Sequence, residues 1–114
     1  MLITLQDDGV LRIYSSPEEA YGDVEALDAE EAFRAIFDEQ GQPYAIKWIR
    51  ANKEGRGLFG LFRMVYNGQY TFLPSGPPDP VALLRVIRDA KIVEPKSMEP
   101  EIRALESRLT SACS

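Results

Sequence analysis

The densest group of reactive side chains in this sequence is acidic and lies between residues 18 and 31. The stretch holds seven carboxylates and no basic side chain: Glu18, Glu19, Asp23, Glu25, Asp28, Glu30 and Glu31. A solvated helix face accounts for Glu18 and Glu19, because the positive end of a helix dipole stabilises acids in its first turn. Like charges at this density repel one another, and a docking face for a cationic partner offers a reason to keep them. We therefore predict that the seven side chains form a partner-binding surface.

The same carboxylates do not follow the pattern of a metal site. An EF-hand calcium loop alternates Asp or Asn ligands, turns at a glycine and ends on glutamate, and no such segment occurs in the chain. Zinc sites use histidine and cysteine, whereas this chain has no histidine and one cysteine, Cys113. We expect no metal ion and no cofactor.

The residues that catalysis usually needs are also missing. Without histidine the chain cannot form a Ser-His-Asp or Cys-His triad, and it lacks the commonest general base near neutral pH. Gly55, Gly57 and Gly60 have the G-x-G-x-x-G spacing of nucleotide-binding loops. The dinucleotide form needs a helix after the glycines to hold the pyrophosphate, but the residues that follow are typical of a strand. We predict that the protein is not an enzyme.

An alternative function rests on the aromatic residues. A small regulatory or ligand-binding domain would bind its ligand between sheet and helices, in a pocket lined by Tyr44, Trp48, Phe62 and Tyr66. Basic side chains between residues 47 and 63 interleave with Trp48, Phe59 and Tyr66, a mixture that is typical of sites for single-stranded nucleic acid. The net charge of −5 weakens the electrostatic attraction that a nucleic-acid binder needs. We expect no nucleic acid and interpret the bases as a solvated rim.

Length and composition predict one domain over residues 1–114. Residues 1–46 hold eleven acids and two bases, whereas residues 47–114 hold seven acids and eleven bases, so the acidic character belongs to the first half. No apolar run approaches the roughly 18 residues that cross a bilayer, and the first residues lack the basic region of a signal peptide. The expected location is the cytoplasm, without membrane contact.

Local patterns predict the elements that position these residues. Asp8-Gly9 is a hairpin turn signal between strands at 2–5 and 10–14. Ser16 and Pro17 are an N-cap and a first helical residue, and they predict a helix over 17–28. Alternating segments at 32–38 and 43–50 predict a second hairpin.

The second half continues the pattern. Segments 58–66 and 70–73 flank Asn67-Gly68 and predict a third hairpin, followed by a proline-rich loop at 74–80. Helices are expected at 81–90, capped by Asp79, and at 101–109. The order ββαββββαα predicts an α+β fold with an antiparallel sheet of about six strands and helices packed on one face. Whether the last helix packs on its own domain or against a second copy, as in a homodimer, stays open.

Residues 13–48 resemble the N-terminal part of small bacterial immunity proteins that are encoded beside polymorphic toxins. The resemblance is carried by a Ser-Pro-Glu-Glu-Ala helix start at Ser16–Ala20, a Glu-to-Asp helix end at Glu25–Asp28 and an aromatic-Asp turn at Phe37–Gly41. It implies a stoichiometric inhibitor that covers a toxin's site with an acidic face and performs no catalysis. The resulting hypothesis is a non-enzymatic protein-binding module that docks a basic toxin or other partner.

Overall fold

The computed structural model describes residues 1–24, 28–50, 53–54, 65–66 and 69–113. In chain order its helices and strands are β1 (Leu2–Gln6), β2 (Val10–Tyr14), α1 (Pro17–Asp23), α2 (Ala29–Ala32), β3 (Phe33–Asp38), β4 (Tyr44–Arg50), β5 (Lys53–Glu54), β6 (Val65–Tyr66), β7 (Gln69–Pro74), α3 (Pro80–Asp89), β8 (Ile92–Glu94) and α4 (Glu99–Cys113), with a 3-10 turn at Lys96–Met98. The predicted α+β class is confirmed. Among the described residues, no helix combines the length and apolar character needed to span a bilayer.

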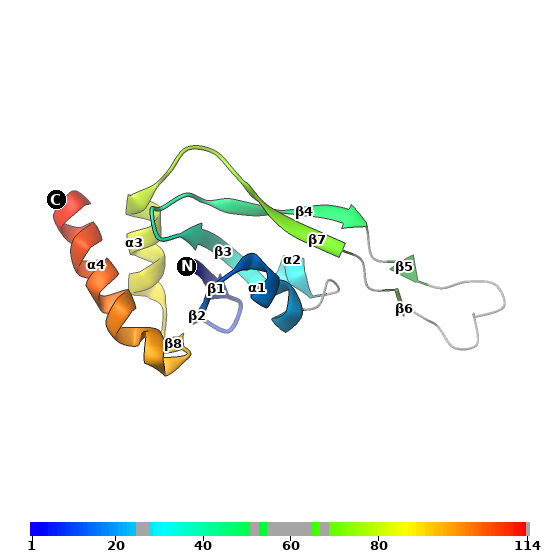
Figure 1. The fold of residues 1–114 in the computed structure, drawn as a ribbon, viewed down its shortest axis with the longest axis horizontal. Coiled ribbons are helices and arrows are strands. Elements are labelled where there is room, and N and C mark those ends of the chain that lie inside the picture. Colours follow the sequence, from blue (N-terminus) through cyan, green and yellow to red (C-terminus); the bar gives the residue numbers. More distant parts are fainter. Residues whose placement is uncertain (25–27, 51–52, 55–64, 67–68, 114) are drawn as a thin grey trace.

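The centre of the molecule is a four-stranded sheet in the order β3-β1-β2-β8 (Figure 1). β1 pairs antiparallel with β2 and β3. The predicted turn at Asp8-Gly9 is confirmed, because Gly9 has a φ of +80° and its N–H donates to the Gln6 carbonyl at 3.0 Å. β8 was not predicted and pairs parallel with β2, so the sheet is mixed rather than antiparallel throughout. β8 has only three residues, and a segment this short cannot be recognised as a strand from the alternation of apolar and polar residues.

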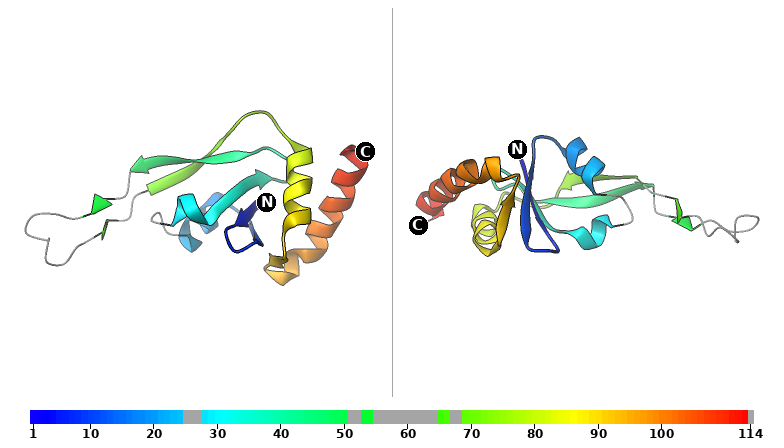
Figure 2. Two further views of the ribbon diagram at one scale, coloured as in Figure 1. Left: turned by 180° about the vertical axis from the view of Figure 1, so that it is seen from behind. Right: turned by 90° about the horizontal axis from the view of Figure 1, so that it is seen from below.

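Helices cover both faces of this sheet, and the prediction of one helical face holds only for the two long helices. Figure 2 shows α3 and α4 on one side of the β1–β2 hairpin and α1 and α2 on the other. Strand alternation gives the sheet two apolar rows that both need cover. Ile3 and Leu11 pack in the core that includes α3 and α4, while Leu2 and Tyr14 pack with α1 and α2.

A two-stranded ribbon of β4 and β7 lies over the α1–α2 side and extends away from the sheet (Figure 1). The predicted hairpin of 32–38 with 43–50 is wrong, since a single bridge, Phe37 to Pro43, joins β3 to β4 in the described chain. Pro43 has no N–H to donate to a strand ladder. β4 pairs with β7 instead, with Ile46 opposite Phe72 and Trp48 opposite Tyr70. Such aromatic cross-strand pairs stabilise a sheet.

The third predicted hairpin is also wrong, because β6 pairs with β5 and β7 with β4. The glycine motif at 55–60, most of the predicted strand 58–66 and the Asn67-Gly68 turn lie outside the described residues.

The helix caps follow the sequence closely, but one helix end does not. Ser16 accepts a hydrogen bond from the Glu19 N–H at 3.4 Å, and Asp79 accepts one from the Ala82 N–H at 3.0 Å, which confirms both predicted N-caps. The helix predicted over 17–28 is shorter than expected, because α1 ends at Asp23 and Val24 is extended; the next described helix is α2. Glycine at position 22 weakens the last turn.

Candidate functional site

The β1–β2 turn, the end of α1 and the helix α2 surround a surface pocket of about 560 Å³. Four carboxylates line it with Val24 and Ala32: Asp7, Asp23, Asp28 and Glu31. No basic side chain is among these lining residues. The Asp7 N–H donates to the Ala32 carbonyl at 2.9 Å and holds the turn beside α2. We call this hollow the acidic pocket.

The acidic pocket gathers three of the predicted partner-binding residues, Asp23, Asp28 and Glu31. It also includes Asp7, which the sequence analysis missed. Asp7 follows directly on a strand and lies sixteen positions before Asp23. Asp7 comes close to the other carboxylates only because the hairpin turn packs against α2. No local sequence pattern could therefore have identified Asp7 as part of the site.

The remaining predicted carboxylates lie elsewhere. Glu19 accepts hydrogen bonds from the Ser15 N–H at 3.0 Å and from the Ser15 hydroxyl at 2.5 Å, and these lower the pKa of Glu19. Glu30 accepts one from Trp48 Nε1 at 2.7 Å and lines a different pocket, between β3 and β4. Glu18 is exposed, and Glu25 lies outside the described residues. The predicted single face is thus divided among several surfaces.

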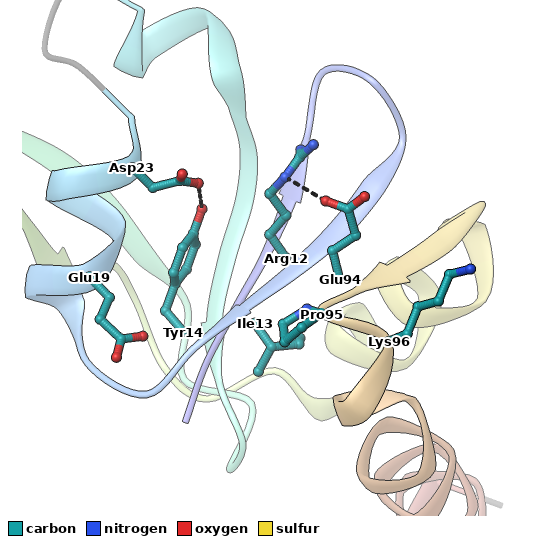
Figure 3. A pocket seen from close by; sticks show the side chains of 8 residues that line it. All are labelled: Arg12, Ile13, Tyr14, Glu19, Asp23, Glu94, Pro95 and Lys96. Carbon is teal, nitrogen blue, oxygen red and sulfur yellow. Dashed lines mark hydrogen bonds and ion pairs between the residues drawn. The ribbon is translucent and has the colours of Figure 1, made fainter.

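A second pocket of about 580 Å³ adjoins the acidic pocket and shares Asp23 with it. In Figure 3, Glu19 and Asp23 of α1 stand on one side, Arg12 and Tyr14 of β2 lie in the middle, and residues 94–96 stand on the other side. Its lining residues are Arg12, Ile13, Tyr14, Glu19, Asp23, Glu94, Pro95 and Lys96. We call it the β2 pocket.

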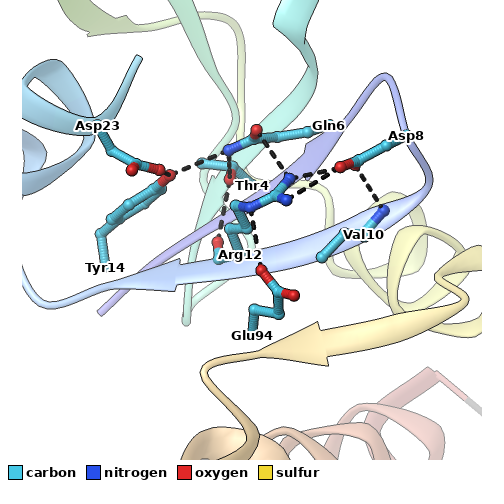
Figure 4. Close-up of polar contacts among 8 residues, drawn as sticks. All are labelled: Thr4, Gln6, Asp8, Val10, Arg12, Tyr14, Asp23 and Glu94. Carbon is cyan, nitrogen blue, oxygen red and sulfur yellow. Dashed lines mark hydrogen bonds and ion pairs between the residues drawn. The ribbon is translucent and has the colours of Figure 1, made fainter.

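A row of polar contacts fixes Asp23 between the two pockets (Figure 4). The Tyr14 hydroxyl donates to Asp23 Oδ2 at 2.6 Å and accepts from Gln6 Nε2 at 3.0 Å. Burial, together with the hydrogen bond to Asp23, raises the pKa of Tyr14 well above its usual range. Tyr14 therefore remains a neutral donor at ordinary pH.

The same row continues to Arg12, whose charge is already balanced. Arg12 Nη1 donates to Gln6 Oε1 at 3.0 Å, Nη2 pairs with Asp8 Oδ2 at 3.0 Å, and Nε pairs with Glu94 Oε2 at 3.3 Å. The hydrogen bond that Arg12 donates to Asp8 lowers the pKa of Asp8 and raises the pKa of Arg12. Because two carboxylates already hold this guanidinium, it does little to neutralise the acids of α1 beside it.

The alternative aromatic pocket is divided by the fold. Tyr44 and Trp48 both pack against the α1–α2 core, where Trp48 meets Tyr70 edge-on at a centroid distance of 5.9 Å. Phe62 and the side chain of Tyr66 lie outside the described residues. Phe33 and Phe72 also meet edge-on, at 5.2 Å, within the same core. Tyr44 lines two surface hollows, one with Glu30 and one with Met1, and Trp48 lines neither of them, so the described members of the predicted set do not share a pocket.

In the part of the chain that the structure describes, no group of three or more His, Cys, Asp or Glu side chains is arranged to hold a metal ion. Among the residues that the structure describes, every buried side-chain nitrogen and oxygen has a hydrogen-bond partner. The chemical feature that the acidic pocket does present is a surface of carboxylates, which is complementary to cationic side chains.

Comparison with known proteins adds no further constraint. The chain matches no protein-family model, and it has no significant match among curated proteins or solved structures.

Proposed function

We propose that the protein is a non-enzymatic binding module that docks a basic protein partner, in the manner of an immunity-type inhibitor. The observation that supports this most is the acidic pocket, where three separate segments contribute Asp7, Asp23, Asp28 and Glu31. Gathering like charges costs stability, and a complementary partner would offset that cost on binding. The single cysteine supports the proposed setting in the bacterial cytoplasm, since nothing in the sequence indicates an oxidising compartment.

Electrostatic complementarity mainly raises the association rate and selects among partners. The partner is expected to present lysine and arginine side chains, and its association should slow as salt is added. Asp23 is held by Tyr14, so it can meet a cation without first losing side-chain freedom.

The test is a pair of charge-matched variants, measured against the partner captured from the native cell. The pocket variant carries Asp7→Lys, Asp28→Lys and Glu31→Lys; Asp23 is spared because Tyr14 depends on it. The control carries Asp89→Lys, Glu99→Lys and Glu101→Lys, which are exposed and belong to α3 and α4. Surface plasmon resonance should show the association rate falling at least about tenfold for the pocket variant and only about twofold for the control.

Equal losses in the two variants would mean that net charge alone matters and that the acidic pocket is not the docking site. An unchanged rate in the pocket variant would reject the proposal as well.

A further inference from the structure

A third hollow, of about 280 Å³, adjoins the β2 pocket on the side away from the acidic pocket. Its lining residues are Met1, Ile13, Tyr14, Ser15, Glu19, Pro95 and Met98. Four of these, Ile13, Tyr14, Glu19 and Pro95, also line the β2 pocket. The two hollows therefore form one groove between α1 and the residues that follow β8, which we call the β2 groove. Figure 3 shows the part of it that the β2 pocket contributes.

The groove is a consequence of strand length. β8 pairs with β2 only from Val10 to Arg12, and the chain turns away after Glu94. Ile13 and Tyr14 continue β2 beyond its neighbour, with α1 on the other side. A segment of another chain could enter the space that β8 leaves beside them.

The two ends of the groove differ in chemistry. Met1 and Met98 line only the smaller hollow and make that end apolar, and Met98 packs against the α3–α4 core while remaining half-exposed. Asp23 and Glu94 line only the β2 pocket and make that end acidic, and Arg12 there is held by Asp8 and Glu94. Ile13, Pro95 and Glu19 lie where the two hollows join. A bound segment would need an apolar side chain close to a cationic one.

We propose that the β2 groove receives an extended segment of the basic partner in which apolar side chains are flanked by lysine or arginine. This inference rests on the proposed function and adds to it the kind of sequence that is recognised. The apolar side chain would cover Pro95 and Met98, and the flanking cations would meet Glu19, Asp23 and Glu94. The opposite charges would attract the partner's segment to the groove, and the apolar contact would fix where the segment binds along it.

The test uses the full chain, labelled with ¹⁵N, and three synthetic peptides with blocked ends. The sequences are Lys-Leu-Lys-Leu-Lys, Lys-Gly-Lys-Gly-Lys and Glu-Leu-Glu-Leu-Glu. The leucine–lysine peptide should shift the amide signals of Ile13, Tyr14, Lys96 and Met98. The glycine peptide has the same charge and should bind at least about tenfold more weakly, and the acidic peptide should not bind.

Two variants separate the apolar from the charged contribution. Met98→Gln keeps the net charge and should weaken the leucine–lysine peptide about fivefold without changing the glycine peptide. Val81→Gln, at a 51% exposed apolar position on α3, is the matched control and should change neither. Lys96 is exposed, and Lys96→Glu should strengthen the binding of both basic peptides several-fold. An unchanged affinity in Lys96→Glu would place the peptides outside the β2 groove, so this variant tests the inference even if Met98→Gln does not fold.

Equal affinities for the two basic peptides would overturn the inference, as would shifts confined to the acidic pocket. Neither result would contradict the proposed function, because that proposal requires only that a basic partner binds through its charge. If neither basic peptide binds, the groove inference fails by itself, and the charge-reversal kinetics decide the proposed function separately.

Discussion

The two faces of the four-stranded sheet pack against different kinds of side chain. The face under α3 and α4 is mainly aliphatic, and Ile3, Leu11, Leu83, Ile87 and Ile102 are at most 1% exposed. The face under α1, α2 and the ribbon is rich in aromatic rings whose hydroxyls have polar partners: Tyr14 donates to Asp23 and Tyr70 to the Val24 carbonyl. Both surface pockets that hold the candidate site open beside the second face.

This difference indicates that the two faces of the sheet are stabilised in different ways. Aliphatic packing stabilises through area and shape and fixes no charged group at a given position. A face held partly by directional hydrogen bonds can accommodate charged groups at its rim, because the bonds fix where those groups stand. We therefore expect most of the stability to come from the α3–α4 side, and the acidic pocket of the proposed function lies on the α1–α2 side.

The largest stability effect is expected on the aliphatic face. Ile87→Ala should lower the free energy of unfolding by about 3 kcal/mol, because it leaves a cavity in a closely packed core. Urea denaturation measures the loss. Val81→Ala on the same helix is the control and should cost less than about 0.5 kcal/mol, since Val81 is largely exposed. If Ile87→Ala also slowed partner association at temperatures where it is folded, the division between the two faces would not hold.

An intermediate effect is expected on the aromatic face. The Tyr70 hydroxyl donates to the Val24 carbonyl at 2.6 Å, and burial raises the pKa of Tyr70 to about 12. Tyr70→Phe should cost about 1–2 kcal/mol, because it leaves a buried carbonyl without its donor. The loss would be read from the urea midpoint.

Tyr44→Phe is the matched change for that measurement. The Tyr44 hydroxyl is 3.4 Å from Asp38 Oδ2 on a half-buried residue, so its removal should cost less than about 0.5 kcal/mol. Equal costs at the two tyrosines would show that hydroxyl partners do not hold this face together.

The smallest effect concerns the ion pair at the rim of the site. The folded pKa of Asp8 is lowered from 3.8 by Arg12, so the pair stabilises the fold when the pH is above the unfolded pKa and is lost as the pH falls through the folded value. Asp8→Asn should cost only a few tenths of a kcal/mol near neutral pH, because Asp8 is exposed and solvent screens the pair. The difference from the natural protein should shrink in thermal denaturation as the pH falls below 3.8 and through the lowered pKa of Asp8.

A double-mutant cycle checks the cause of that effect. In an Arg12→Gln background, Asp8→Asn should lose its pH-dependent contribution, since its cation is gone. A pH dependence that persists without Arg12 would point to another partner of Asp8.

Local features were predictable from the sequence, and long-range ones were not. The Asp8-Gly9 turn and the Asp79 cap depend on residues a few positions apart, and both were predicted correctly. The pairing of β4 with β7 joins residues that are 19 to 30 positions apart, whereas the alternating pattern predicts a hairpin between nearer segments. Of the candidate site, the acidic residues of 18–31 were found from their density, but Asp7 and the row from Gln6 to Tyr14 were not.

The sequence by itself determined the α+β class, the first hairpin, the helix caps and the acidity of the first half, because turns, caps and charge are properties of neighbouring residues. Only the tertiary structure decided which carboxylates share a pocket and which are held by other side chains. It brought Asp7 beside Asp28, tied Asp23 to Tyr14 and turned Glu30 toward Trp48. Those contacts depend on how strands and helices pack across the sheet, and periodicity along a chain carries no record of that packing.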